Sequence, residues 1–555
     1  MTGSWVGAAA LAACWPLMGS AVGALGVRRL RLPPVFLAPL VFAAGSIAAY
    51  AVLWAYFFDP RAGRAAWTVL VLLNATWLGP RLYRGWRGEG FAPDAWMPFA
   101  LTALVTAACV GYLAWAGVSP PRRFTIALPV ADHLVPQLFA DRLAKGLREE
   151  PQPLAPLTTF ALITQTSDRP PLQAGVVLTA RPAWPISPAT LDATYQTVAT
   201  LCQITALPAL LALCAALDLS NRERRFVLTA VPCSGFFLVN AVYPWPKLYA
   251  AALVITGLAI LVHVTRRGEA TDGHAAAIGV LTGLALLAHG SPVFSLLATP
   301  MLMGQAGVRR LLTARRIAWA ILAMVLTLGP WLAYQRYVDP PGTRLVRIHL
   351  AGELPPPARD DRPVLAAILD AYRNVGGREW LHGRIQNVRM QGFVGWHGDD
   401  LVADAQHAVF FRHLPALDLL AVGLVAFAFQ RRHGSGLTVR TLAAYALLAW
   451  ALWTLVMFSG DSAAIQHGSY ATLLLFQMVG AIGLAAWPRI GSGMLALHVA
   501  GFAAVWLLPR AGVPALWRPE AAVLAVASTL GAIALAWAHL RDPAPTTGDG
   551  RCDVR

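Results

Sequence analysis

The order of apolar and polar residues divides this chain into long apolar stretches separated by short polar segments. A helix needs roughly 20 mostly apolar residues to cross the hydrocarbon core of a bilayer. Stretches of about that length recur along most of the chain and predict an all-α, polytopic bundle of transmembrane helices. The predicted spans are residues 4–26, 34–58, 66–83, 96–117, 194–217, 226–243, 248–265, 275–290, 291–306, 317–334, 416–430, 441–459, 470–487, 493–508 and 519–538.

The sequence near residue 290 and at the N-terminus has special features. Residues 275–290 and 291–306 are short, and Gly290-Ser291-Pro292 separates them, so they form either two crossings or one re-entrant hairpin. The total is therefore 13 or 15 crossings. Residues 4–26 are followed, not preceded, by basic residues, which is the reverse of a cleavable signal peptide. We expect this stretch to be the first membrane helix.

Composition supports the membrane assignment. Hydrophobic residues make up 57% of the chain and charged residues only 13%, against about 25% charged residues in soluble domains. This composition excludes a cytosolic globular enzyme, a disordered chain and a nucleic-acid-binding domain. The net charge of +16 would suit an anionic partner, but the arginines fall mainly in short loops, where they orient membrane helices. The six cysteines form no CxxC pair and imply neither a disulfide framework nor a zinc site.

The basic loops predict the orientation of the chain. Clusters of arginine fall in alternating short loops, and the side that carries them should be the cytoplasm. The N-terminus is then outside and the C-terminus is cytoplasmic. The clusters are Arg28/Arg29/Arg31, Arg81/Arg84/Arg87, Arg222/Arg224/Arg225, Arg266/Arg267, Arg309/Arg310/Arg315/Arg316 and Arg431/Arg432/Arg440.

This orientation places two long loops outside the membrane. Both contain amphipathic stretches, at residues 133–148, 363–375 and 401–413, which are expected to lie at the membrane interface. They either cap the bundle or help to bind a substrate. The predicted regions are N-terminal membrane helices (1–117), a first outer loop (118–193), central membrane helices (194–334), a second outer loop (335–415), C-terminal membrane helices (416–540) and a cytoplasmic tail (541–555).

Ionisable residues are scarce inside the predicted spans. Asp218 and His263 fall near cytoplasmic ends, Asp418 near an outer end, and His498 in the middle of a span. A proton or ion pathway usually has more intramembrane carboxylates or histidines. We interpret His498 as a packing residue, and this scarcity argues against a transporter.

Polar residues instead gather in four short segments that the orientation places on the outer face. They are Ala131-Asp132-His133-Leu134, Tyr243-Pro244-Trp245-Pro246-Lys247, His289-Gly290-Ser291-Pro292 and Gln466-His467-Gly468-Ser469-Tyr470. A carboxylate such as Asp132 can act as a general base or hold a divalent cation. Lys247, His289 and His467 can bind a phosphate or diphosphate.

Each of these segments also has a purely structural interpretation. Asp132 can serve as a helix N-cap, and Lys247 can extend toward the lipid head groups. Tyr243 and Trp245 suit an interfacial aromatic belt. Only together do the four segments indicate a site for a phosphate-bearing lipid or sugar.

At these residues the sequence resembles the C-class membrane glycosyltransferases, which use polyprenyl-phosphate sugars. The resemblance lies in PVADHLVPQLFADRL, NAVYPWPKLYAAALV, LLAHGSPVFSLLA and QHGSYATLLLF, and in the many spans with a long first outer loop. It implies that Asp132 is the catalytic base or a metal-linked acid. Many members of the class carry paired acids in this loop, whereas His133 follows Asp132 here and the next acid is Asp141.

The resemblance implies a hexosyl- or pentosyltransferase of the bacterial inner membrane. It would move a sugar from a lipid-linked donor to an envelope acceptor at the outer face of that membrane. His133, Trp245, Lys247, His289 and His467 would bind substrate, and Asp132 and Asp141 are the candidates for a divalent cation. The expected partners are the lipid-linked donor and membrane lipids, with no nucleic acid.

Alternatives remain at this point. A second candidate cation site is the run His397, Asp399, Asp400 and Asp404, for which a solvated loop is the simpler interpretation. The chain is alternatively a transporter or lipid-carrier flippase, or a non-catalytic membrane component of an envelope-assembly complex.

Overall fold

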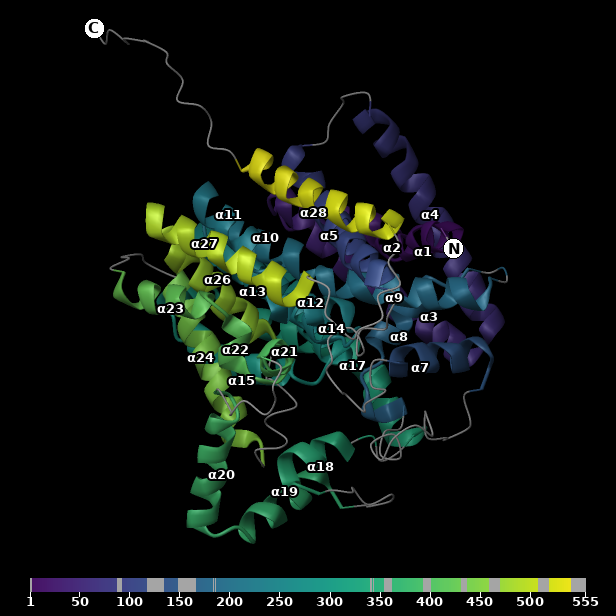
Figure 1. The fold of residues 1–555 in the computed structure, drawn as a ribbon. Helices are drawn as coiled ribbons and strands as arrows, with labels where there is room; N and C mark the ends of the chain where they lie inside the picture. The colour runs from purple at the N-terminus through teal and green to yellow at the C-terminus, as the bar shows by residue number, and fades with distance from the viewer. Residues whose placement is uncertain are drawn as a thin grey trace, which may run out of the picture.

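The computed structural model describes most of the chain, and helices are the only regular secondary structure among the residues that it describes (Figure 1). The described residues are 2–86, 92–116, 134–147, 166–182, 184, 186–339, 342, 344–353, 362–392, 401–430, 437–458, 470–507 and 519–540. Nine helices within these ranges are long and apolar enough to cross a membrane. The predicted all-α polytopic bundle is confirmed, and the chain is a multi-pass membrane protein.

The nine long spans match nine of the predicted stretches. They are Trp5–Arg29, Pro34–Phe58, Pro93–Leu113, Thr190–Ala216, Lys247–Arg267, Ala314–Tyr337, Val439–Val456, Pro488–Leu507 and Ala522–His539. The predicted span 66–83 lies inside α4 (Pro60–Trp86), which is helical but not among these nine. Four predicted spans are shorter helices, namely α14 (Asp272–Ala288), α15 (Pro292–Met303), α23 (Leu420–Phe429) and α26 (Tyr470–Ala485).

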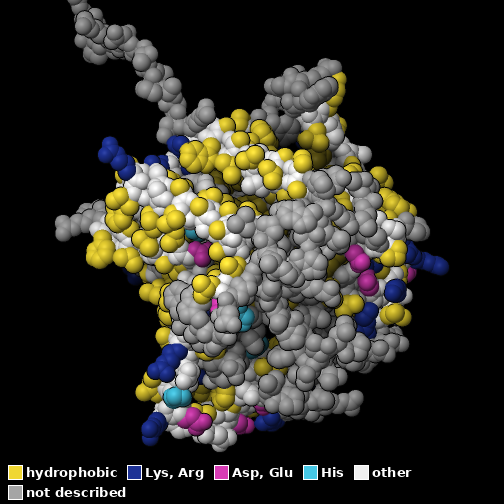
Figure 2. Space-filling view, viewed as in Figure 1, with side chains coloured by type: hydrophobic (Ala, Val, Ile, Leu, Met, Phe, Trp, Pro, Cys, Tyr) yellow, Lys and Arg dark blue, Asp and Glu magenta, His cyan; other side chains and the backbone are white. Residues whose placement is uncertain are grey.

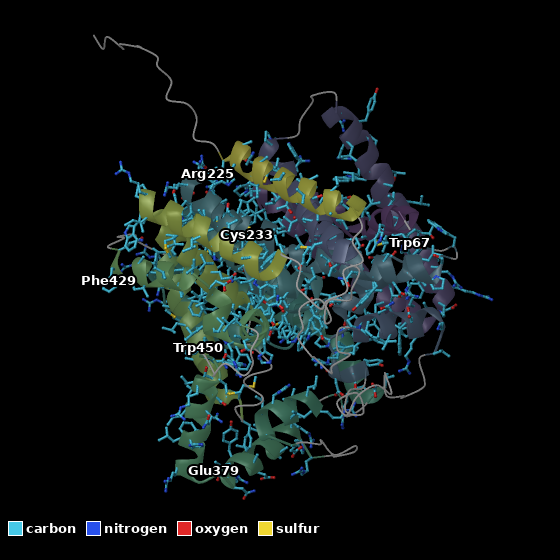
Figure 3. The ribbon with its side chains drawn as sticks, in the orientation of Figure 1. Trp67, Arg225, Cys233, Glu379, Phe429 and Trp450 are labelled. Atoms are coloured by element: carbon cyan, nitrogen blue, oxygen red, sulfur yellow. The ribbon has the colours of Figure 1, made fainter. Side chains whose placement is uncertain are left out.

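The predicted span 226–243 is broken rather than continuous. It consists of α11 (Asn221–Ala230) and α12 (Gly235–Val242), whose axes differ by 58°. Pro232 lies in the break and has no backbone N–H to continue the helix. Ser234 caps α12, because its side chain accepts a hydrogen bond from Phe237 N. Figure 3 labels Cys233, also in the break, near the middle of the bundle.

A central group of helices forms the core of the bundle. The span Thr190–Ala216 joins α9 (Pro188–Ile204) and α10 (Ala206–Ala216), and 94% of the residues in its most apolar 18-residue stretch are buried. For α13 (Lys247–Arg267) this share is 83%, whereas for α17 (Ala314–Tyr337) it is 11%. Helices that are apolar all round are either buried in protein or face lipid. The first two therefore lie inside the bundle, and α17 lies at its edge.

Small residues allow neighbouring helices to approach closely. Gly423 of α23 faces Gly480 and Gly483 of α26, and a Cβ on Gly423 would lie 2.0 Å from the Gly480 carbonyl oxygen. Such contacts are typical of helix pairs in membranes. Distant parts of the chain also meet: α28 (Pro519–His539) runs along α5 (Pro93–Ala116), and His539 contacts Asp94 at 2.7 Å (Figure 1).

The two predicted outer loops contain short helices. The first holds α7 (Val135–Ala144), the 3₁₀ turn η3 (Thr166–Asp168) and α8 (Leu172–Thr179). The second holds α18 (Arg344–Ala351), α19 (Val364–Arg373), α20 (Gly377–Arg389) and α21 (Leu401–Phe411). Helices α18, α19 and α20 lie together at one end of the bundle, at the bottom of Figure 1.

The remaining helices connect or extend these elements. They are α1 (Thr2–Ala12), α2 (Cys14–Arg29), η1 (Pro34–Phe36), α3 (Leu37–Phe58), α16 (Ala306–Leu311), α22 (His413–Leu417), α24 (Val439–Val456), α27 (Pro488–Phe502) and a π-helical turn, Ala503–Leu507.

Candidate functional site

Three of the predicted substrate-binding residues meet in one buried site. The Lys247 ammonium lies 3.8 Å from the centre of the Trp245 ring and 4.9 Å from that of the Tyr470 ring. The ring centres of Trp245 and His289 are 6.4 Å apart. These residues come from distant segments of the chain, because Trp245 and Tyr470 are 225 positions apart. The convergence of Lys247, Trp245 and His289 is therefore a feature of the fold.

Helix ends place these side chains. Tyr243 directly follows α12, and two tight turns come next. In these turns Trp245 N donates to Tyr243 O and Lys247 N donates to Trp245 O, each at 2.7 Å. Lys247 is then the first residue of α13, and His289 directly follows α14. Tyr470 is the first residue of α26.

Burial excludes the structural alternatives for two of these residues. Lys247 is 1% exposed, so it does not extend into the lipid head groups. Trp245 is 5% exposed and contacts the Tyr243 ring rather than lipid, so it does not belong to an interfacial aromatic belt.

Two further basic residues act on this site electrostatically. Burial lowers the pKa of His289 well below its usual value, and Lys247, Arg169 and His349 lower it further. Burial lowers the pKa of His349 to about 3, with further contributions from Arg169 and Lys247. Both histidines are therefore neutral at pH 7, and the full charges near them come from Lys247 and Arg169.

His289 is fixed in one tautomer. Its Nδ1 accepts a hydrogen bond from Ser291 N at 3.0 Å, so the proton of the neutral ring is on Nε2. A neutral histidine in this form presents an N–H donor to a ligand. We call Arg169, Trp245, Lys247, His289, His349 and Tyr470 the Lys247 cluster.

A buried ion pair holds the two outer loops together beside the cluster. Arg344 Nε lies 2.9 Å from Asp168 Oδ2, and the two side chains are 4% and 0% exposed. Asp168 precedes Arg169 in the first loop, and Arg344 lies on the same short helix as His349 in the second. The pair therefore helps to position both of these cationic or hydrogen-bonding residues.

An apolar groove begins next to His289. It has a volume of about 400 Å³ and lies between α13, α14, α15 and α17. Pro292 and Ser295, which follow His289 in the chain, line one end of the groove, and His274 and Arg316 line the other. The groove is lined mainly by aliphatic side chains and is suited to an alkyl or isoprenoid chain.

Other predicted site residues lie elsewhere or outside the description. Asp132, His133 and His467 fall outside the described residues, as do His397, Asp399 and Asp400. Asp141 forms an ion pair with Arg181, and Asp404 lies on α21. Among the described residues, no group of three or more histidine, cysteine, aspartate or glutamate side chains is placed to hold a metal ion. A divalent cation remains a prediction that rests on Asp132.

Sequence reasoning missed Arg169 and His349. Arg169 lies in a loop, where arginine is normally solvated, and only the adjacent apolar helix α8 suggests burial. In α18, Arg344, Arg347, Ile348 and Ala351 are buried and share one face of the helix. The amphipathic pattern of α18 predicts that its arginines lie in solvent. The sequence therefore does not indicate that this helix contributes to the site.

No family model, curated protein or solved structure matches this chain. The resemblance to C-class glycosyltransferases therefore stays a prediction from short motifs and architecture.

Proposed function

We propose that this protein is a membrane glycosyltransferase that uses a polyprenyl-phosphate sugar. It would transfer the sugar to an envelope acceptor at the outer face of the bacterial inner membrane, with the N-terminus outside and the C-terminus in the cytoplasm. The observation that carries the proposal is the meeting of Lys247, His289 and Trp245 in one buried site, with Arg169 and His349 near enough to act on it electrostatically.

The cluster is suited to an anionic phosphate. Lys247 and Arg169 supply positive charge, and the neutral His289 ring supplies an N–H donor. Lys247 is also at the first position of α13, where the helix dipole disfavours a cation and favours an anion. A bound phosphate would compensate these charges in a site with little water, where electrostatic attraction is strong.

The apolar groove beside His289 supports a lipid-linked donor over a soluble one. A phosphate in the cluster would allow an attached isoprenoid chain to enter the groove between α14 and α15 at Pro292. The head group and the chain would then each have a site of matching polarity.

The proposed reaction is a displacement at the anomeric carbon of the donor sugar. The acceptor hydroxyl oxygen forms a bond to this carbon, and the bond from the carbon to the phosphate oxygen breaks. The hydroxyl proton goes to Asp132, and polyprenyl phosphate leaves with the electron pair. Lys247 and Arg169 would stabilise the negative charge that develops on the leaving phosphate.

The broken span α11–α12 favours one alternative, a lipid-carrier flippase. Discontinuous helices line the substrate sites of many transporters. Such a protein would move the lipid-linked sugar across a vesicle membrane without consuming it.

Purified protein incubated with a panel of polyprenyl-phosphate sugars and an envelope extract tests the proposal. We expect consumption of at least one donor, and movement of an intact donor between leaflets would support the flippase instead. Asp132→Asn should abolish turnover without reducing donor binding or membrane insertion. Full activity of this variant would exclude Asp132 as the base.

Head-group binding is tested with the only two lysines of the chain. Lys247→Gln should weaken binding of a polyprenyl phosphate at least 100-fold, because it removes a buried charge from the phosphate site. Lys145→Gln, at an exposed position after α7, should leave binding unchanged. Equal affinities of the two variants would contradict the proposed phosphate site.

A further inference from the structure

A second cavity lies on another side of the bundle and takes no part in the proposed reaction. It has a volume of about 770 Å³ and is enclosed by α21, α22, α23, α27 and the π-helical turn Ala503–Leu507. Most of its lining is apolar. Its polar lining residues are Asp404, His407, Arg412, Asp418 and His498. We call it the Asp418 cavity.

The cavity opens toward a lipid-facing surface. Leu414, Val422, Val425 and Leu497, on the helices around it, are each at least 45% exposed. In a membrane protein, such exposed aliphatic side chains face the hydrocarbon core. Figure 2 shows a few acidic and histidine side chains among hydrophobic ones below α27. A ligand dissolved in the bilayer can therefore reach the cavity laterally.

The break between α11 and α12 positions two polar residues of the cavity. His498 Nε2 donates to the carbonyl oxygen of Ala230, the last residue of α11, at 3.0 Å. The Asp418 carboxylate accepts from the backbone N–H of Gly235, the first residue of α12. Both backbone groups lose their helical partners at the break. His498 thus has the packing role that its sequence predicts.

Asp418 has a second feature that the break does not explain. It has φ 49° and ψ −140°, a backbone conformation that costs a residue with a side chain about 1–3 kcal/mol. Its side chain is exposed to the cavity, where most of the surrounding groups are apolar. An ionisable group that faces a cavity within the membrane costs free energy, and such groups generally serve a function.

The charges of the lining select the chemistry of the ligand. Among the described lining residues, Asp418 turns a carboxylate toward the cavity, whereas Arg412, the one arginine, donates to Met390 O at 2.7 Å. An anionic head group would meet the like charge of Asp418. A hydroxyl or ammonium group would instead donate to Asp418 while its chain fills the apolar part.

The π-helical turn also points to a binding role. π-Helical turns are rare and are frequently found at functional sites. Here the turn presents Val505 and Trp506 to the cavity, and Gln406 Nε2 donates to Val505 O at 3.0 Å. The turn thereby joins α27 to α21, the two helices on either side of the opening.

We propose that the Asp418 cavity binds a membrane-dissolved, long-chain molecule whose polar end is a hydroxyl or ammonium group, with Asp418 as the hydrogen-bond acceptor. The site is separate from the Lys247 cluster and does not depend on glycosyl transfer.

Photolabelling of the full protein in lipid nanodiscs tests this proposal. Three diazirine-bearing C16 probes that differ only in their end group, an alcohol, an amine and a carboxylic acid, are crosslinked and mapped by peptide mass spectrometry. We expect the alcohol or the amine to label α21 and α27 at least tenfold more than the acid does. The stronger of the two identifies the end group. Equal labelling by all three probes, or labelling spread evenly over α4 and α17, would overturn the proposal.

A pair of aspartate variants isolates the role of Asp418. Asp418→Asn keeps the shape of the side chain and should reduce labelling by the preferred probe at least fivefold. Asp218→Asn is a matched control, because Asp218 has a similar φ of 51° but pairs with Arg266 on the surface. Labelling of Asp418→Asn at the wild-type level would exclude Asp418 as the acceptor.

A pair of glycine variants tests the cavity without altering charge. Gly501 lines the cavity, and a Cβ at this position has no neighbour within 4 Å, so Gly501→Leu should fill the cavity and block labelling without loss of the fold. Gly493→Leu, on the same helix and also in open space, should label like the wild type. Unchanged labelling of Gly501→Leu would place the probe outside the cavity. Lys247→Gln should not change the labelling, which separates this result from the test of the proposed function.

Discussion

The Lys247 cluster and the Asp418 cavity are neighbours with opposite chemistry. The Phe410 ring of α21 packs on Tyr243, with ring centres 5.9 Å apart, while Asp404 and His407 of the same helix line the cavity. The cluster is cationic, aromatic and buried, whereas the cavity is largely apolar with two carboxylates and opens to lipid. One helix thus separates the proposed phosphate site from the proposed site for a hydroxyl or ammonium group.

Helix α26 serves both regions from different positions. Tyr470 at its first residue contacts the Lys247 ammonium. Gln477, two turns further on, donates to Ser234 Oγ at 3.1 Å and to Ala416 O at 2.8 Å, beside the broken span and the cavity. The two regions therefore share α26 but not their chemistry, because different loops and helix ends supply the side chains of each region.

The largest effect that should separate the two regions is expected for Arg344→Met. This variant removes the Arg344 guanidinium from the buried Asp168 carboxylate and should cost about 3–5 kcal/mol of stability. Arg169 and His349 should lose their positions, so polyprenyl-phosphate binding should fall, while alcohol or amine labelling at the Asp418 cavity stays. The measurements are thermal unfolding in detergent and the two binding assays.

Arg336→Met, at an exposed position near the end of α17, is the matched control and should behave like the wild type. If Arg344→Met reduces cavity labelling as strongly as phosphate binding, the two regions are not independent.

A smaller effect, on the opposite region, is expected for Gly423→Leu. Its side chain would meet the backbone of Gly480 and force α23 away from α26, at a cost of about 1–3 kcal/mol. Because Leu419 and Ala421 beside it line the cavity, probe labelling should fall more than phosphate binding does. Thermal unfolding and photolabelling measure the two effects. Gly493→Leu, which meets no neighbour, should be at least as stable as the wild type.

The effect that is smallest near neutral pH is a pH dependence of the Lys247 cluster. His289 and His349 have pKa values below 6.5 in the folded protein, so the unfolded chain binds more protons as the pH falls below 6.5. The free energy of unfolding should therefore be highest above pH 6.5. Below this pH it should decline toward pH 3, by up to about 1.4 kcal/mol per histidine and pH unit.

His349→Gln should flatten this decline when unfolding is measured between pH 7 and pH 5. His382→Gln, at an exposed position on α20, should retain the wild-type slope. A bound polyprenyl phosphate should also reduce the decline, because an anion favours the protonated histidines. An identical slope for His349→Gln and the wild type would show that His349 is not a buried neutral group.

The sequence predicted the bundle because helices in a bilayer satisfy their backbone hydrogen bonds locally. Apolar length therefore located the membrane helices, and amphipathic spacing located α7, α19 and α21 within the outer loops. The sequence also selected Trp245, Lys247 and His289, since polar residues at the ends of apolar helices are conspicuous. It did not predict the break at Pro232, because 226–243 is apolar throughout apart from a few small polar residues.

The amino-acid sequence alone was enough to show a multi-pass helical membrane protein and to select the helix ends that carry the candidate functional residues. Only the tertiary structure decided that Arg169 and Lys247 both act electrostatically on His289 and His349, and that Asp418 binds the N–H of Gly235, 183 positions earlier in the chain. The reason is physical: helix formation depends on neighbouring residues, whereas the meeting of helix ends depends on packing between side chains that are far apart in sequence.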